Sequence, residues 1–269
     1  MPARRAPVGA RSTALSALLM PAPLAALVAV LMTVLLTGCG AADEGEGERG
    51  RGPADLTPSH APKASPGVDP VVLVHGLGGS PADWDTFRGW FTRDGYAGEH
   101  TVAVDLSGQA ATSNAANART VADAVTRLKA ETGADKVDLV AFSMGNLSAR
   151  HYLAHLGGTE HVREFAGIAG PNRGMDTPLT EGCGESATTD ACEMARGSGF
   201  LRALNSGDPT PGPVRYATWR SDGDEIVPAA ATPLDGATNH RVPGSLGHVE
   251  LIGDESVYRS VRDFLDQRG

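Results

Sequence analysis

Basic residues are in short supply in this chain of 269 residues, where 23 Lys and Arg stand against 32 Asp and Glu. The first 38 residues hold three Arg and no acidic residue, so the remainder carries 20 basic against 32 acidic residues, a net charge near −12. Affinity for nucleic acid and for anionic lipid headgroups depends mainly on Lys and Arg that neutralise negative charge. The shortage therefore excludes nucleic acid as an expected partner.

Cysteine is rare as well, and the first of the three cysteines closes a segment with the order of an export signal. A basic start is followed by a long apolar run over residues 14–36, and the sequence Leu-Thr-Gly-Cys occupies 36–39. This ending resembles a bacterial lipobox, in which cleavage before the cysteine leaves Cys39 as the lipidated first residue. An uncleaved membrane anchor and a secretory signal with an incidental cysteine are the alternatives. All three place the globular part outside the cytoplasm, and we expect a lipoprotein at the outer face of the cell membrane.

The two remaining cysteines, Cys183 and Cys192, lie nine positions apart in a stretch rich in Gly, Ser and Thr. An oxidising compartment favours joining two such thiols in a disulfide. A pair of metal ligands is the alternative, but it lacks neighbouring His or Cys partners. We therefore expect a disulfide here and no metal site.

Bulky apolar residues are almost missing between residues 41 and 68, so this stretch cannot bury enough surface to offset the cost of chain ordering. We expect an export signal over residues 1–38, a lipidated cysteine and flexible linker over 39–68, and one catalytic domain over 69–269. A hydrophobic content of 41% is sufficient for a single domain of about 200 residues. We expect that domain to be a monomer.

Within the domain, unbroken apolar runs of strand length alternate with helical patterns. Unbroken runs are typical of strands buried on both faces of a parallel sheet, and the alternation indicates βαβ crossovers. The irregular stretch 172–213 is interpreted as an excursion over the carboxyl edge of the sheet, where ligands of open α/β sheets bind. The expected strands cover 71–75, 101–105, 137–142, 164–169 and 214–219, and the clearest helical patterns cover 81–93, 120–129 and 254–267.

Ser143 has the sequence context of a nucleophile elbow. The strand at 137–142 precedes it and a helical pattern follows, which is the strand, sharp turn and helix that such a serine requires. Ala141 and Gly145 supply the small residues needed two positions before and two after it, because the turn brings strand and helix backbones together. A serine in front of a helix is more often a cap, so this pentapeptide does not decide the function alone.

A glycine-rich loop, His-Gly-Leu-Gly-Gly at 75–79, directly follows an earlier strand. In the α/β-hydrolase fold the loop after that strand supplies one N–H of the oxyanion hole, and the residue after the nucleophile supplies the other. We therefore expect the backbone amides of Leu77 and Met144 to form an oxyanion hole. A plain tight turn is the alternative.

An acid and a base follow later in the chain, in the order Ser, Asp, His. Asp224 comes after the strand at 214–219 and before an apolar dipeptide, where a carboxylate is well placed to hold an imidazole; Asp222 is the reserve candidate. His248 lies in a Gly-bounded loop before the last helical pattern and is the candidate general base, although a lone loop histidine is usually a solvated surface group.

Together these motifs resemble the class 2 lipase family, the small lidless secreted bacterial lipases. The similarity runs from Pro70 to the C-terminal helix. Its ordered matches are Val-Val-Leu-Val-His-Gly at 71–76, Ala-Val-Asp at 103–105, the segment 131–138, Ala-x-Ser-x-Gly at 141–145, Asp-Glu-Ile-Val at 224–227 and Gly-His at 247–248.

The resemblance implies an α/β-hydrolase fold, with a compact and mostly parallel central sheet and helices on both faces. It implies that Ser143 is the nucleophile, Asp224 the acid and His248 the base, with Leu77 and Met144 supplying the oxyanion-hole amides. The chain departs from the family at Asn146, where a second glycine is common, and in the longer stretch 172–213, which could form a partial lid or reshape the acyl pocket.

The expected activity is hydrolysis of a carboxylic ester, such as a triacylglycerol or a shorter acyl ester, through an acyl-enzyme and without a metal or organic cofactor. A thioesterase or an acyltransferase of the cell envelope would use the same chemistry on another substrate or acceptor. A non-catalytic binding protein on the same fold is a more distant alternative, since fold alone does not prove activity.

Overall fold

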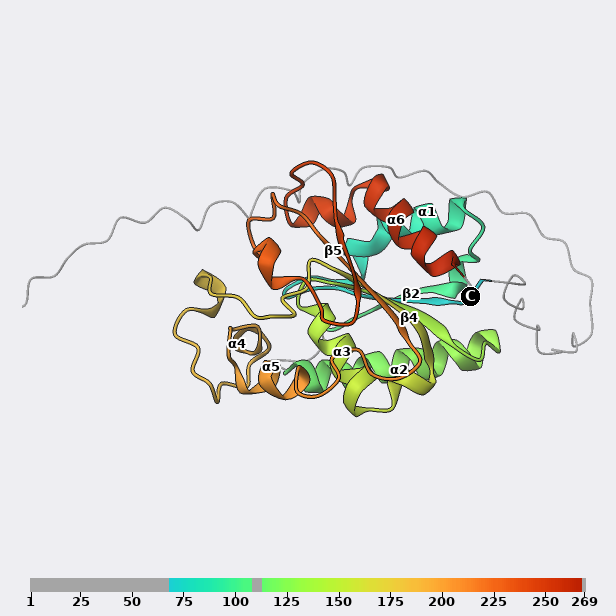
Figure 1. The fold of residues 1–269 in the computed structure, drawn as a ribbon. Coiled ribbons are helices and arrows are strands. Elements are labelled where there is room, and N and C mark those ends of the chain that lie inside the picture. Colours follow the sequence, from blue (N-terminus) through green and yellow to red (C-terminus); the bar gives the residue numbers. More distant parts are fainter. Residues whose placement is uncertain (1–67, 108–112, 268–269) are drawn as a thin grey trace, which may run out of the picture. The chain divides into compact units, whose positions relative to one another are not determined.

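Six parallel strands form one sheet in the order β2-β1-β3-β4-β5-β6 (Figure 1). This computed structural model describes residues 68–107 and 113–267. Every residue of the central strands β1 and β3 is buried, because helices cover both faces of the sheet. The strands are β1 (Val71–Val74), β2 (Thr101–Val104), β3 (Val137–Phe142), β4 (Val162–Ile168), β5 (Arg215–Arg220) and β6 (Thr238–Arg241).

The helices form two layers, with α1 and α6 on one face of the sheet and α2 and α3 on the other (Figure 1). This arrangement confirms the expected α/β-hydrolase architecture. The α-helices are α1 (Asp85–Arg93), α2 (Asn114–Thr132), α3 (Gly145–His155), α4 (Asp190–Glu193), α5 (Gly199–Leu204) and α6 (Glu255–Asp266). Short 3-10 helices occupy Pro81–Trp84, Gly98–His100, Gly158–Glu160, Pro178–Thr180, Ala229–Ala231 and Val249–Ile252.

Aromatic side chains fill the core between α1, α6 and the sheet. Phe87 and Phe91 are fully buried and both make edge-to-face contacts with Tyr258 of α6, at ring-centroid distances of 5.4 and 5.1 Å. Such pairs add to the free energy gained from burying apolar area. The three- and four-residue spacing of aromatic residues in α1 thus specifies the face on which α1 meets α6.

Most expected boundaries differ from the structure by one or two residues, and three larger or more informative differences follow. Helix α2 begins at Asn114 rather than at 120, because the Ser113 side chain caps it by accepting the Ala116 N–H at 3.2 Å. Strand β4 ends at Ile168, and Ala169 leaves the strand with a φ of +49°. The strand β6 was not expected, because its four residues are polar and three of them are exposed at the edge of the sheet.

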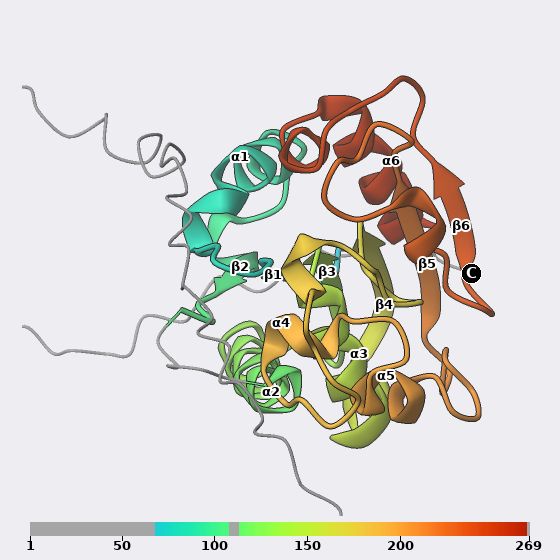
Figure 2. The ribbon, with the colours of Figure 1, turned by 90° about the vertical axis from the view of Figure 1, so that its left-hand side faces the viewer.

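The excursion between β4 and β5 contains α4 and α5, which lie in front of the sheet in Figure 2. Met144 and Leu147, at the start of α3, share a small apolar core with Met175, Met194 and other residues of this segment. The excursion therefore packs against the elements that follow β3.

The expected export signal, Cys39 and linker lie outside the described residues, so the boundaries at 38 and 68 stay predictions. No helix within residues 68–107 and 113–267 is both long enough and apolar enough to cross a bilayer.

Candidate active site

Ser143 occupies a strained turn between β3 and α3. Its φ is +53°, a left-handed conformation that non-glycine residues rarely adopt. Close approach of the neighbouring backbones requires small residues here. A Cβ atom at Gly145 would lie 2.5 Å from the His75 carbonyl oxygen, and one at Gly76 would lie 2.8 Å from the Ser143 Cβ. The local sequence thus forms the sharp elbow that its small residues predicted.

The structure brings Ser143, His248 and Asp224 together from three loops. The Ser143 Oγ lies 2.9 Å from His248 Nε2, and His248 Nδ1 lies 2.8 Å from Asp224 Oδ2. Since Asp224 accepts the Nδ1 proton, Nε2 is the nitrogen that accepts the hydroxyl proton of Ser143. The side chains of His248 and Asp224 are only 7% and 2% exposed, so bulk water does not compete for these hydrogen bonds.

The carboxylate of Asp224 is oriented by the chain that follows it. Its Oδ1 accepts the backbone N–H groups of Ile226 and Val227 at 2.9 and 2.8 Å, which leaves Oδ2 for the imidazole. Asp222, the reserve candidate, does not reach His248. It instead binds Arg220 and Arg241 at the surface, and the hydrogen bond from Arg241 is the main cause that lowers the pKa of this carboxyl.

Two further carboxylates hold the loop of His248, and the sequence motifs did not reveal them. Glu225 Oε2 accepts the backbone N–H of His248 at 3.0 Å, and Glu250 Oε2 accepts that of Gly247 at 2.7 Å. The Phe142 ring packs against the imidazole with ring centroids 4.7 Å apart. The contacts of Glu225 and Phe142 depend on tertiary packing, whereas Glu250 lies only three residues after Gly247 in the same loop.

The glycine-rich loop after β1 lies beside Ser143. His75 fixes it, since Nδ1 donates to the Gly76 carbonyl at 2.8 Å while Nε2 accepts the Leu106 N–H at 3.0 Å. In the part of the chain that the structure describes, the amides of Leu77 and Met144 donate no hydrogen bond to another protein group. Leu77 lines the cleft beside Ser143, and Met144 directly follows Ser143 in the chain.

A cleft of about 570 Å³ opens at Ser143 and His248. Apolar side chains form most of its wall, which suits a hydrocarbon chain better than a charged ligand. A larger hollow of about 720 Å³ beside β5, β6 and α6 contains none of the three hydrogen-bonded residues. The apolar residues of the cleft are Leu77, Phe142, Met175, Leu179, Met194, Ile226, Val249 and Ile252.

The family model for class 2 lipases matches residues 68–261, a range that contains the elbow, the acid and the histidine loop. The chain belongs to the class 2 lipase family. Family and fold together support carboxylic ester hydrolysis.

Solved lipases resemble this chain in fold at low sequence identity. Lipase B of Aspergillus fumigatus superposes with a TM-score of 0.63 at 19% identity, over 76% of this chain and 54% of that one. The Bacillus licheniformis lipase BlEst2 gives 0.66 at 17% identity in its propeptide form, over 78% and 53% of the two chains. Its mature form gives 0.63 at 19% identity, over 76% and 95%. The chain thus spans about half the length of the first two structures.

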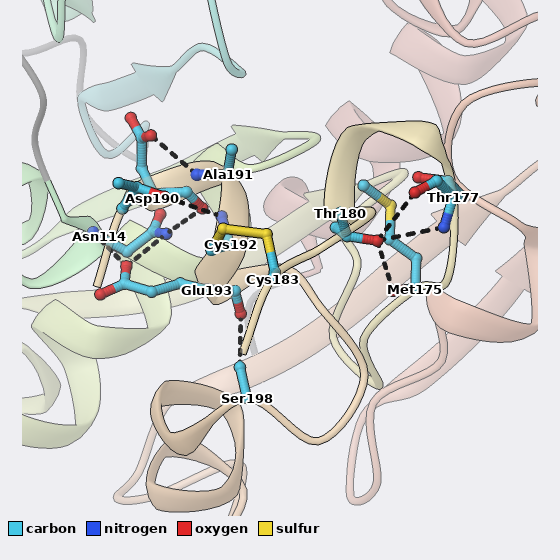
Figure 3. Close-up of a disulfide and its surroundings, with 11 residues drawn as sticks. Asn114, Met175, Thr177, Thr180, Cys183, Asp190, Ala191, Cys192, Glu193 and Ser198 are labelled. Carbon is cyan, nitrogen blue, oxygen red and sulfur yellow. Dashed lines mark hydrogen bonds between the residues drawn. A yellow bond between two sulfur atoms is a disulfide. The ribbon is translucent and has the colours of Figure 1, made fainter. Parts of the chain in front are cut away.

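The excursion 172–213 forms one wall of the cleft, and a disulfide joins Cys183 to Cys192 within it (Figure 3). Directly after Cys192, the buried Glu193 accepts the backbone N–H of Asn114 at 2.6 Å and its side-chain amide at 2.9 Å. Met194, the next residue, lines the cleft. The Glu193 contact therefore attaches this wall to the beginning of α2, and the disulfide closes a loop within the wall.

The alternative interpretation of Cys183 and Cys192 is a pair of metal ligands. In residues 68–107 and 113–267, no three His, Cys, Asp or Glu side chains converge as a metal site would require. The sulfur atoms are joined to each other instead.

Proposed function

We propose that this class 2 lipase hydrolyses carboxylic esters by forming an acyl-enzyme on Ser143. The observation that carries the proposal is the unbroken hydrogen-bonded series from Ser143 Oγ through His248 to Asp224. A serine hydroxyl is a weak nucleophile until a neighbouring base accepts its proton, and an oriented acid keeps that base in the required tautomer.

In the first half of the reaction, Ser143 Oγ attacks the ester carbonyl while its proton moves to His248 Nε2. The carbonyl π electrons move to oxygen, and the resulting oxyanion accepts hydrogen bonds from the amides of Leu77 and Met144. Collapse of this intermediate breaks the ester C–O bond, and the imidazolium of His248 returns the proton to the departing alkoxide. Asp224 stabilises the imidazolium throughout.

In the second half, water enters as the nucleophile. His248 accepts a proton from water as the water oxygen attacks the acyl carbonyl, and the same two amides receive the second oxyanion. Breakage of the bond to Ser143 Oγ releases the carboxylic acid, and the proton returns to the serine. Every proton is carried by His248, so the proposed cycle needs no metal or organic cofactor.

Exposed apolar side chains around the cleft favour a substrate with an apolar acyl chain. Leu77, Leu179 and Val249 are 40%, 46% and 68% exposed, and all three line the cleft although they come from separate loops. Exposed apolar side chains that converge on one cleft favour binding of an apolar ligand there. We therefore propose acyl esters, including triacylglycerols, as the substrate class.

The test combines labelling with a substrate series. A fluorophosphonate should add one phosphonyl group to the wild type and none to Ser143→Ala, and Ser143→Ala should lower kcat by roughly 10⁴- to 10⁶-fold. Among p-nitrophenyl esters from acetate to palmitate, kcat/KM should rise with chain length until the cleft is filled. Equal labelling of both proteins would refute the nucleophile, and preference for acetate would refute the apolar substrate.

We also propose that the enzyme works at the outer face of the cell membrane, attached through a lipid on Cys39. The lipobox-like ending of the apolar run supports this location. The net negative charge of the domain gives it little attraction for anionic headgroups, so the lipid would provide the attachment.

A further inference from the structure

Asn146, the second residue of α3, directs its side chain beneath the nucleophile elbow. The residue is completely buried, and its Nδ2 lies 3.0 Å from the carbonyl oxygen of Ser143 and 3.2 Å from that of Ala141. A third carbonyl, that of Ile168 at the end of β4, lies 3.0 Å away. Only the amide nitrogen can donate to these oxygens, so the orientation of the side chain is determined by its partners.

These hydrogen bonds connect two strained turns. Ser143 and Ala169 have φ values of +53° and +49°, and they are the two non-glycine residues with positive φ in residues 68–107 and 113–267. Each directly follows a strand, β3 and β4 respectively. Asn146 holds the carbonyl of Ser143 itself and the carbonyl just before Ala169. Unfavourable backbone conformations persist only where the surroundings fix them.

Two glycines on the β4 side make room for Asn146. A Cβ at Gly170 would have Asn146 atoms as its three nearest neighbours, with Oδ1 at 2.6 Å and Cβ at 2.7 Å. A Cβ at Gly167 would overlap Asn146 Oδ1. The side chain that replaces the family's common second glycine is therefore accommodated by small residues across the interface, and it fills space that a glycine would leave empty.

We infer that Asn146 is a positioning residue that fixes the Ser143 turn against the end of β4. The inference rests on the proposed role of Ser143 as nucleophile. Asn146 does not line the cleft, so its loss leaves substrate contacts in place. Its loss lets the elbow relax and moves Ser143 Oγ away from His248 Nε2, and small displacements of a nucleophile lower the rate of attack strongly.

The experiment compares the buried Asn146 with Asn239, an exposed asparagine whose side-chain amide also donates to backbone carbonyls, in the full-length protein. Asn146→Ala removes the elbow contact, whereas the control Asn239→Ala removes an asparagine on β6 that also donates to two carbonyls, those of Leu234 and Ala237. Per folded molecule, Asn146→Ala should lower kcat and the fluorophosphonate labelling rate together by about 10- to 100-fold, with KM nearly unchanged. Asn239→Ala should change only the urea midpoint.

A double-mutant cycle tests the packing of Asn146 against Gly170 by stability alone. It needs no measurement of catalysis, and it remains informative if one variant is less stable. Gly170→Ala should lower the urea midpoint in the wild-type background and have a smaller effect in the Asn146→Gly background, where the overlapping atoms are absent. Additive effects would contradict the accommodation of Asn146 by Gly170.

The outcomes separate this role from the proposed function. If Asn146→Ala and Asn146→Gly keep the wild-type kcat and labelling rate per folded molecule while Ser143→Ala is inert, the positioning role is wrong and the nucleophile stands. If Ser143→Ala retains turnover and label, the proposed function fails regardless of Asn146.

Discussion

Asp222 and Asp224 stand two positions apart and have opposite surroundings. Asp224 is turned inward, where one oxygen meets two backbone amides and the other meets His248. Asp222 is 40% exposed and lies between two arginines. Both carboxylates follow the same strand, so sequence spacing alone could not separate them, and the difference arises from the direction in which the loop turns.

Replacing each aspartate by asparagine should therefore have very different effects. Asp224→Asn should lower kcat by about 10⁴-fold, because an amide can donate to Nδ1 and so favour the wrong imidazole tautomer. Asp222→Asn should keep nearly full kcat, since it loses only exposed ion pairs. Steady-state hydrolysis of a p-nitrophenyl ester measures both, and full turnover by Asp224→Asn would move the acid role elsewhere.

Local sequence patterns identify residues whose chemistry requires a particular backbone conformation around them. Ser143 was predictable because the elbow requires small neighbours, and His248 because it follows glycine in a loop after the last strand of the pattern. Glu225 and Asn146 were not assigned a role. Both act on backbone groups of distant segments, and contacts of this kind depend on tertiary packing rather than on residue spacing.

At the scale of elements, burial decided what the sequence could predict. Strands β1 to β5 were predicted because a strand covered on both faces needs a continuous apolar run. The edge strand β6 has no such requirement, and its residues Thr-Asn-His-Arg resemble a loop. The helices α4 and α5 are too short, at four and six residues, to show a helical period.

The contact between α4 and α2 should make the stability of the protein depend on pH. Burial is the main cause that raises the pKa of Glu193, and the hydrogen bonds from Asn114 offset part of this effect. Because the folded-state pKa lies above the unfolded one, the native state binds more protons in the interval between them. The contribution of Glu193 to stability is therefore complete below its ordinary pKa and is lost as pH rises through the raised value.

Glu193→Gln tests this dependence, since glutamine keeps an oxygen acceptor for Asn114 but carries no charge. The variant should gain stability relative to the wild type as pH rises from about 4 to about 7, the range above the ordinary pKa of a glutamate. Urea unfolding at a series of pH values measures the difference. If the difference in unfolding free energy between variant and wild type stays constant over this range, ionisation of Glu193 does not destabilise the folded protein.

For the molecule as a whole, the described contacts of the site and the cleft lie between His75 and Gly253. The described residues begin at Val68, just before this region. Pro70 accepts the Asp138 N–H at 2.8 Å, and Asp69 pairs with Arg163. These contacts join Asp69 and Pro70 to the sheet, and the boundary near residue 68 stays a prediction.

If the domain begins near residue 68 and a lipid on Cys39 holds it at the membrane, as proposed, then residues 1–67 determine location and the domain alone determines catalysis. A protein that begins at Val68 should match the full chain in kcat on a soluble ester, because it keeps every described contact of the site. In a bacterial host, the full chain should incorporate an alkyne-labelled fatty acid and sediment with membranes, and Cys39→Ser should lose the label.

Membrane sedimentation of wild type without label would instead favour an uncleaved anchor, since the apolar run over residues 14–36 is long enough to span a bilayer. Recovery of unlabelled wild type in the medium would favour a plain secretory signal, and in both cases the kcat of the Val68 protein should stay the same.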